Sequence, residues 1–133
     1  MNITNSAKET KRLGYMMAKR FPKNKSVLAL KGNLGSGKTT FLQGFAKGLG
    51  VKEKILSPTF VLFKHFKGKN RDFYHFDCYR VKGKDLNSLG FKDIISNPRN
   101  IVAVEWPRTK LPKAVVIEFQ FLDKNKRRII IKK

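Results

Sequence analysis

The hydrophobic residues of the chain follow two spacings, one typical of helices and one typical of buried strands. Helical spacing occurs over residues 6–20, and again from Thr40 to a stop at Gly50. Continuous apolar runs of strand length occupy residues 27–31 and 101–104. These patterns predict two helices and two buried strands, which is an α/β arrangement.

Two further pairs of apolar segments are each separated by a polar turn and predict antiparallel hairpins. Residues 60–66 and 73–77 form the first pair, and residues 115–119 and 128–131 form the second. The first hairpin follows a helix at a point where a parallel sheet would need a crossover connection. We therefore expect a mixed sheet. Residues 85–95, between the hairpins, predict two short helical turns.

The polar stretch between the first predicted strand and the second predicted helix matches the phosphate-loop pattern G-x-x-x-x-G-K-[ST]. Its glycines let the backbone turn tightly and aim N–H groups at phosphate oxygens, and the start of the helix adds its positive dipole end. No Asn-Lys-x-Asp sequence for reading guanine follows, so ATP is the expected nucleotide. The residues expected to bind ATP here are Asn33, Leu34, Gly35, Ser36, Gly37, Lys38, Thr39 and Thr40.

Within this loop, the Lys38 side chain is expected to reach the β- and γ-phosphates, and the Thr39 hydroxyl to ligate Mg²⁺. Such a site also needs acidic groups to hold the ion and to orient water. Glu105 follows an apolar run and Asp77 ends a predicted strand, so both are expected at the sheet edge where α/β proteins bind ligands. The alternative for each is a surface acid at a strand end.

Four other segments or residues leave their roles open. Ser57-Pro58-Thr59 is either an ordinary turn or a nucleotide-sensing segment. Trp106 fits the core, a base-stacking position or a partner surface, and we include it among the candidate ATP-binding residues. His75 fits a packed histidine better than a metal ligand, because no second His or Cys lies at ligand spacing. Cys78 fits a small buried side chain.

The composition indicates one soluble, globular domain over residues 1–133, with 41% hydrophobic and 29% charged residues. No apolar run approaches the roughly 20 residues that a membrane span needs. The polar residues 1–10 contain no signal-peptide core, which favours a cytoplasmic protein. The single cysteine excludes an internal disulfide and a cysteine-only metal site.

The chain has 30 Lys and Arg residues against 9 Asp and Glu residues, a formal net charge of +21. Such a charge attracts polyanions, including nucleic acid. A chain rich in Lys, Asn, Ile and Phe is also what an AT-rich genome encodes. Affinity for RNA and compositional bias are therefore both open explanations.

With these residues in view, the chain resembles the TsaE family of small bacterial ATPases that act in threonylcarbamoyladenosine modification of tRNA. The order and spacing of the motifs agree from about Ser6 to the second hairpin. Many ATPases share the phosphate loop, whereas the combination with the later motifs is far more specific. The matching motifs are residues 32–40, Gly48-Leu49-Gly50-Val51, Ser57-Pro58-Thr59-Phe60, Tyr74-His75-Phe76-Asp77-Cys78-Tyr79-Arg80 and Val104-Glu105-Trp106-Pro107.

The resemblance implies a three-layer P-loop NTPase-like fold with a mixed central sheet. It implies ATP binding and slow ATP hydrolysis coupled to partner proteins. In the family these partners are TsaD and TsaB, which attach the threonylcarbamoyl group to adenosine next to the anticodon. The family member resets that complex between turnovers and is not itself the transferase.

By position, the resemblance implies catalytic roles for Lys38, Asp77 and Glu105, with Mg²⁺ held by Thr39 and Glu105. It also implies that Ser57, Pro58 and Thr59 form a nucleotide-responsive segment. Thr10 would lie on the first helix near the adenine.

The chain also departs from the family pattern. Asn33 and Ser36 replace a usual Asp and Ala, and both changes leave the backbone cradle intact. Paired acids after Tyr-Arg are reduced to Lys84-Asp85-Leu86, and the net charge is higher than expected for the family.

Two other classes of function stay open from the sequence. A small-molecule kinase would use the same loop, but it usually carries an Arg-bearing lid and an acceptor pocket, for which 133 residues leave little room. A basic RNA-binding module with a structural nucleotide site would bind RNA in a salt-dependent way, regardless of ATP. For the tRNA-modification function that the resemblance implies, the basic surface is a candidate contact for tRNA.

Overall fold

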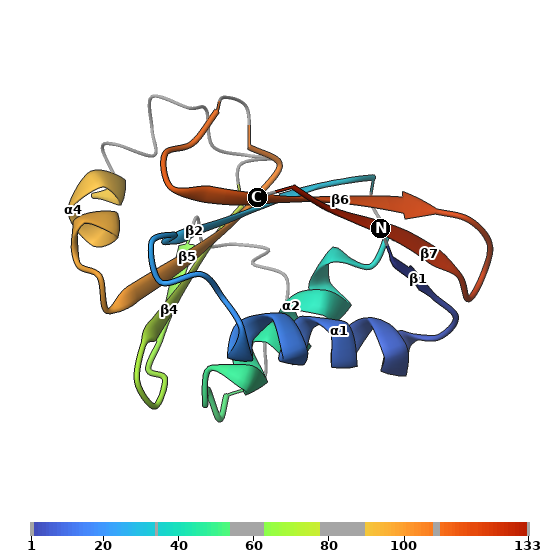
Figure 1. Cartoon of the computed structure of the whole chain (residues 1–133), viewed down its shortest axis with the longest axis horizontal. Helices are drawn as coiled ribbons and strands as arrows, with labels where there is room; N and C mark the ends of the chain where they lie inside the picture. The colour runs from blue at the N-terminus through green and yellow to red at the C-terminus, as the bar shows by residue number, and fades with distance from the viewer. Residues whose placement is uncertain (1, 34, 54–62, 78–89, 108–109, 133) are drawn as a thin grey trace.

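The described residues form a seven-stranded sheet in the order β1-β7-β6-β2-β5-β4-β3, which lies at the centre of this part of the chain (Figure 1). The computed structural model describes residues 2–33, 35–53, 63–77, 90–107 and 110–132. The strands are β1 Asn2–Thr4, β2 Val27–Lys31, β3 Phe63–Phe66, β4 Asp72–Asp77, β5 Asn100–Glu105, β6 Ala114–Phe121 and β7 Arg127–Lys132. The helices within these ranges are α1 Ala7–Lys19, α2 Lys38–Gly48 and α4 Phe91–Ser96.

The sheet is mixed, as the sequence predicts. Strand β2 lies between β5 and β6 and runs parallel to both, and β4 runs parallel to β5. The two predicted hairpins are present as the antiparallel pairs β3–β4 and β6–β7. Residues 60–62 of the predicted first hairpin, and the predicted helical turn over 85–89, lie outside the described residues.

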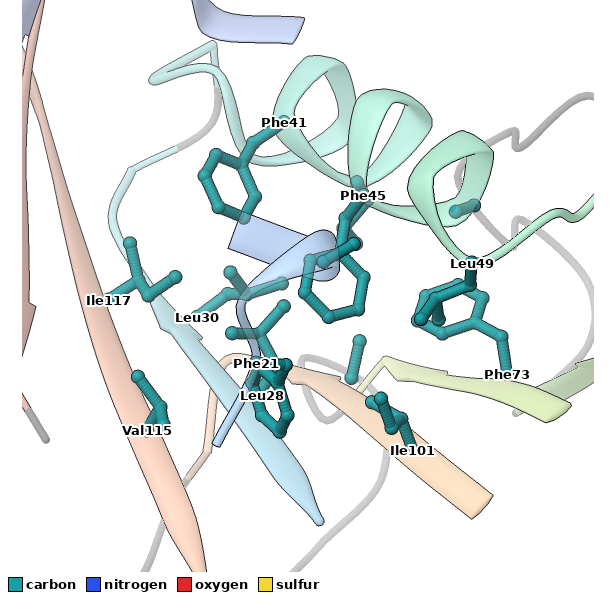
Figure 2. Packing of buried hydrophobic residues seen from close by; sticks show 14 of the residues in the cluster. Phe21, Leu28, Leu30, Phe41, Phe45, Leu49, Phe73, Ile101, Val115 and Ile117 are labelled. Atoms are coloured by element: carbon teal, nitrogen blue, oxygen red, sulfur yellow. The ribbon is translucent and has the colours of Figure 1, made fainter. Parts of the chain in front are cut away.

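Helices cover both faces of the sheet and give the three layers that the family resemblance implies (Figure 1). Alternate residues of the buried strand β2 face opposite layers. Leu28 and Leu30 pack with Phe41 and Phe45 of α2, as Figure 2 shows. Val27 belongs instead to a cluster that includes Phe91 of α4. Each fully buried phenylalanine contributes roughly 1.5–3 kcal/mol of apolar burial, so α2 is fixed firmly against the sheet.

Helix α1 begins where the sequence predicts. The Ser6 Oγ accepts a hydrogen bond from the Glu9 N–H at 3.1 Å, which is half of a capping box. The Glu9 carboxylate accepts from the Asn5 N–H at 3.2 Å, one residue before the expected partner. Helix α1 also packs closely on α2. A Cβ atom at Gly44 would lie 1.8 Å from the Lys11 carbonyl oxygen, so the two helices approach this closely only with a glycine at position 44.

One strand is not predicted from the sequence. Strand β1 pairs antiparallel with β7, with Ile3 opposite Arg128. Its three residues are too few to show a period of two. None of the helices in the described part of the chain is long and apolar enough to cross a membrane.

Candidate nucleotide-phosphate site

Three parallel strands end side by side at one edge of the sheet, where the candidate chemistry gathers. In the pairing of β2 with β5, Leu30 lies opposite Glu105. In the pairing of β4 with β5, Asp77 lies opposite the same Glu105. The phosphate loop leaves β2 directly after Lys31, at this edge. The backbone positions of the loop and of both candidate acids are therefore adjacent.

The described part of the loop has the backbone conformation that its glycines allow. Gly35 has φ +78° and Gly37 has φ +103°, both in the left-handed region that residues with a Cβ rarely adopt. Gly37 is the N-cap of α2 and accepts a hydrogen bond from the Phe41 N–H at 2.9 Å. The positive end of the α2 dipole therefore points into the loop.

The loop, the end of β5 and the start of β7 together line a cavity of about 250 Å³. Sites that enclose a whole small ligand are typically about 300–1,000 Å³, so this cavity suits part of a nucleotide. Nine of the lining residues are sequence candidates and the tenth, Arg127, is not. The lining residues are Asn33, Gly35, Ser36, Gly37, Lys38, Thr39, Thr40, Glu105, Trp106 and Arg127.

The buried Lys38 side chain folds back over the loop. Its Nζ donates to the carbonyl oxygen of Gly32 and, at 3.5 Å, to that of Asn33. The same Nζ lies 3.9 Å from the centre of the Trp106 ring, a cation–π contact. Binding of a phosphate by Lys38 would therefore exchange these contacts for phosphate oxygens.

The residue Glu105 is 5% exposed, and its carboxylate meets the side chain of His75, a residue that is 1% exposed. The distance between His75 Nε2 and Glu105 Oε2 is 2.5 Å, with the ring N–H donating to the carboxylate. His75 is thus a packed histidine, as predicted, but its contact with the candidate metal ligand is not evident from the sequence. Residue spacing could not reveal it, because it depends on the register of β4 against β5.

Trp106 connects the cavity to the core. Its backbone has φ +59°, in the left-handed region, and its N–H donates to the Leu30 carbonyl at 3.0 Å. The half-buried ring packs against the hydrophobic cluster around Phe91 and also lines the cavity. Of the three roles left open for Trp106, packing in the core is observed, and the ring also borders the cavity.

A second hollow of about 110 Å³ adjoins the cavity and shares Gly37, Thr40 and Arg127 with it. Thr10 lines this hollow, so the structure brings the predicted helix residue next to the phosphate loop. The Thr10 hydroxyl is 2.7 Å from the Thr4 hydroxyl and donates to the Ser6 carbonyl at 3.2 Å. These contacts tie α1 to β1 beside the site.

Arg127 was not identified from the sequence. Its guanidinium donates to the carbonyl oxygens of Asp123 at 2.7 Å and Lys126 at 2.9 Å, and it stacks on the Phe121 ring at 4.6 Å. The turn before β7 was predicted, but Arg127 reaches the cavity because β6 runs parallel to β2 and ends at this edge, where β7 begins.

The remaining predicted site residues lie outside what the structure describes. They are Leu34, Ser57, Pro58 and Thr59, together with the side chain of Asp77. Within the described ranges, no group of three or more His, Cys, Asp or Glu side chains could hold a metal ion. Mg²⁺ typically takes one or two protein ligands plus phosphate oxygens and water, so Thr39 and Glu105 fit that ion.

Fold and site together define a nucleotide-binding protein of the P-loop class. The family model described as "Threonylcarbamoyl adenosine biosynthesis protein TsaE" matches residues 4–130. The chain belongs to the TsaE family, which confirms the resemblance drawn from its motifs.

Individual relatives agree with this assignment. The chain is 36% identical to a tRNA threonylcarbamoyladenosine biosynthesis protein TsaE of Rickettsia typhi, over 100% of this chain and 94% of the relative. It is 35% identical to the protein of the same name from Aquifex aeolicus, over 97% and 92%. The crystal structure of Bacillus subtilis YdiB superposes with a TM-score of 0.72 at 32% identity, covering 98% of this chain and 82% of that one.

Proposed function

We propose that the protein binds and slowly hydrolyses ATP in the biosynthesis of threonylcarbamoyladenosine on tRNA, without catalysing the transfer itself. The observation that carries the proposal is the meeting of Lys38, Thr39 and Glu105 in one cavity at the N-terminus of α2. The relatives named for this pathway support its place in tRNA modification. That role would be performed in the cytoplasm.

In this proposal the loop backbone and the α2 N-terminus bind the phosphates of ATP. Lys38 binds the β- and γ-phosphates after releasing the carbonyl oxygens of Gly32 and Asn33. Thr39 and Glu105 hold Mg²⁺, which when bound neutralises charge on the phosphates. Asp77, whose backbone lies opposite Glu105, orients the attacking water.

The Lys38 ammonium and the Glu105 carboxylate, which Mg²⁺ and ATP would engage, are both in contact with other residues of this chain. Lys38 contacts loop carbonyls and Trp106, and Glu105 contacts His75. Productive binding of Mg²⁺ and ATP must exchange both sets of contacts. A low intrinsic rate of hydrolysis that partner proteins raise is consistent with this requirement. We propose TsaB and TsaD as these partners, and resetting of their complex between turnovers as the outcome.

The test is ATP hydrolysis by the purified protein, alone and with the TsaB–TsaD pair of the same organism. We expect little turnover alone and a clear rise with the pair. Glu105→Gln should keep much of the ATP binding and lose Mg²⁺-dependent turnover, and Lys38→Ala should lose phosphate affinity. Absence of any rise with the pair would contradict the partner-coupled ATPase. Turnover that requires a small-molecule acceptor would favour the kinase class instead.

A further inference from the structure

A larger hollow of about 720 Å³ lies on the face of the sheet away from α1 and α2. Its floor includes Ala29 of β2 and Val116 of β6. These residues alternate with Leu28, Leu30, Val115 and Ile117, which all pack in the cluster under α1 and α2. The hollow is therefore separated from the α1–α2 layer by the sheet itself. We call it the lysine groove.

The ionisable side chains around the lysine groove are five lysines and one glutamate: Lys25, Lys31, Lys110, Lys113, Lys132 and Glu118. Glu118 is paired with Lys132, at 2.9 Å between Oε1 and Nζ. In the described part of the chain, the other four lysines make no ion pair within 4.0 Å. All but Lys25 are exposed. The groove thus presents a concentrated positive charge to solvent.

The kind of cation indicates the kind of ligand. The lining of the groove among the described residues contains neither arginine nor an aromatic ring. Cores of protein–protein interfaces are enriched in Arg and aromatic residues and depleted in Lys, so a protein partner is disfavoured. Bases bound as single strands need aromatic stacking, which is also missing. Lysine ammonium groups around an open groove suit the phosphates of a folded nucleic acid. Such phosphate contacts form regardless of the base sequence.

The lysine groove also adjoins the phosphate loop without being part of it. It shares Lys31 and Glu118 with a neighbouring hollow of about 430 Å³, which is also lined by Gly32 and Asn33. Pro107, which lines the groove, directly follows Trp106 of the phosphate cavity. A polyanion in the groove would therefore lie beside the back of the phosphate loop while the nucleotide site stays open.

We propose that the lysine groove binds the sugar-phosphate backbone of a folded RNA. The inference deepens the proposed function and rests on it only for the choice of tRNA as the RNA to test. It also gives part of the +21 net charge a functional role. The five groove lysines are spread along the sequence, but the fold brings them together around one hollow.

The experiment measures filter binding of radiolabelled, unmodified tRNA to the full chain over a range of NaCl concentrations. The groove variant carries Lys25→Gln, Lys110→Gln and Lys113→Gln. Lys31 and Lys132 are left in place, because Lys31 precedes the phosphate loop and Lys132 pairs with Glu118. The control variant, with the same loss of charge on the α1–α2 layer, carries Lys8→Gln, Lys11→Gln and Lys47→Gln, all at exposed positions.

Each phosphate contact contributes about 0.7–0.9 to the slope of log K against log salt. The groove variant should therefore lower that slope by about 2–3 and weaken tRNA binding at low salt at least tenfold. The control variant should change the slope by less than about 1. ATP binding of both variants, measured by calorimetry, should equal that of the wild type and shows that they are folded.

An equal loss in both variants would overturn the inference, because the charge would then act diffusely. Unchanged tRNA binding by the groove variant, with lost binding to the TsaB–TsaD pair, would overturn it in favour of a protein interface. Lys38→Ala separates the two proposals. Intact tRNA binding in that variant with lost ATP binding supports two distinct sites, and a failure of ATP hydrolysis alone would leave the groove result standing.

Discussion

The contact between His75 and Glu105 leads to a quantitative prediction about stability. Both side chains are almost fully buried and their polar atoms are 2.5 Å apart. Replacing His75 with Phe keeps an aromatic ring near Phe73, whose ring centre is 6.4 Å away, but removes the donor. The Glu105 carboxylate then stays buried without this partner. Breaking such a pair costs about 3–5 kcal/mol, and we take about 3 because Glu105 borders the open cavity.

The assay is urea denaturation of His75→Phe against the wild type at neutral pH. With an m value of about 2 kcal/mol/M, a loss of about 3 kcal/mol lowers the midpoint by about 1.5 M. Glu105→Gln in the same background removes the unpaired charge and should restore most of the midpoint. The double-mutant cycle should give a coupling free energy of at least about 1.5 kcal/mol. His75→Gln retains an N–H donor and should lose less than His75→Phe.

The same variant tests whether Glu105 meets the cation of bound Mg·ATP. In the wild type that cation would have to displace the His75 contact, whereas in His75→Phe it would meet an unpaired carboxylate. Mg·ATP should therefore raise the midpoint of His75→Phe more than that of the wild type. A His75→Phe midpoint within about 0.25 M of the wild type, or purely additive effects in the cycle, would refute the reasoning.

Three further predictions concern the loop, the helix pair and the sheet end. Lys38→Ala should weaken ATP binding by calorimetry at least about tenfold, since a charge-assisted hydrogen bond contributes about 1.5–3 kcal/mol; unchanged affinity would contradict the site. Gly44→Ala places a Cβ 1.8 Å from a backbone oxygen of α1, so the helices must separate and thermal denaturation should show a loss of about 1–3 kcal/mol or more. The hydrogen bond from His65 lowers the pKa of the Asp72 carboxyl. This hydrogen bond stabilises the fold by about 0.5 kcal/mol. The stabilisation is present above the unfolded pKa near 3.9 and is lost as pH falls through the lower folded pKa. Asp72→Asn should therefore lower the free energy of unfolding at pH 7 and leave it unchanged near pH 2. An equal loss of stability at both pH values would show that the ionised carboxylate is not the stabilising group.

The sequence predicted those parts of the fold that local pattern determines. Strands β2 and β5 are continuous apolar runs because they are buried on both faces, and such runs are visible without a structure. The phosphate loop has a fixed pattern of residue types. Glu105 could be placed at the site because parallel strands bring their carboxyl ends to one edge.

What the sequence did not predict depends on contacts between distant segments. The partner of His75 depends on strand register. Arg127 lies at the cavity because β6 runs parallel to β2, so that β7 begins at the sheet edge of the phosphate loop. Strand β1 exists through its pairing with β7 and has no pattern of its own. The lysine groove gathers residues from 25 to 132, so charge counting shows its sign but not its place.

The position of Trp106 has a practical consequence for spectroscopy. It is the only tryptophan of the chain, and its ring lies 3.9 Å from the Lys38 ammonium. Any event that draws Lys38 towards a phosphate removes a cation from the face of this indole and changes its intrinsic emission. The protein therefore contains its own optical reporter of phosphate-loop occupancy, and rates of nucleotide entry and exit can be followed by stopped flow on the unlabelled chain.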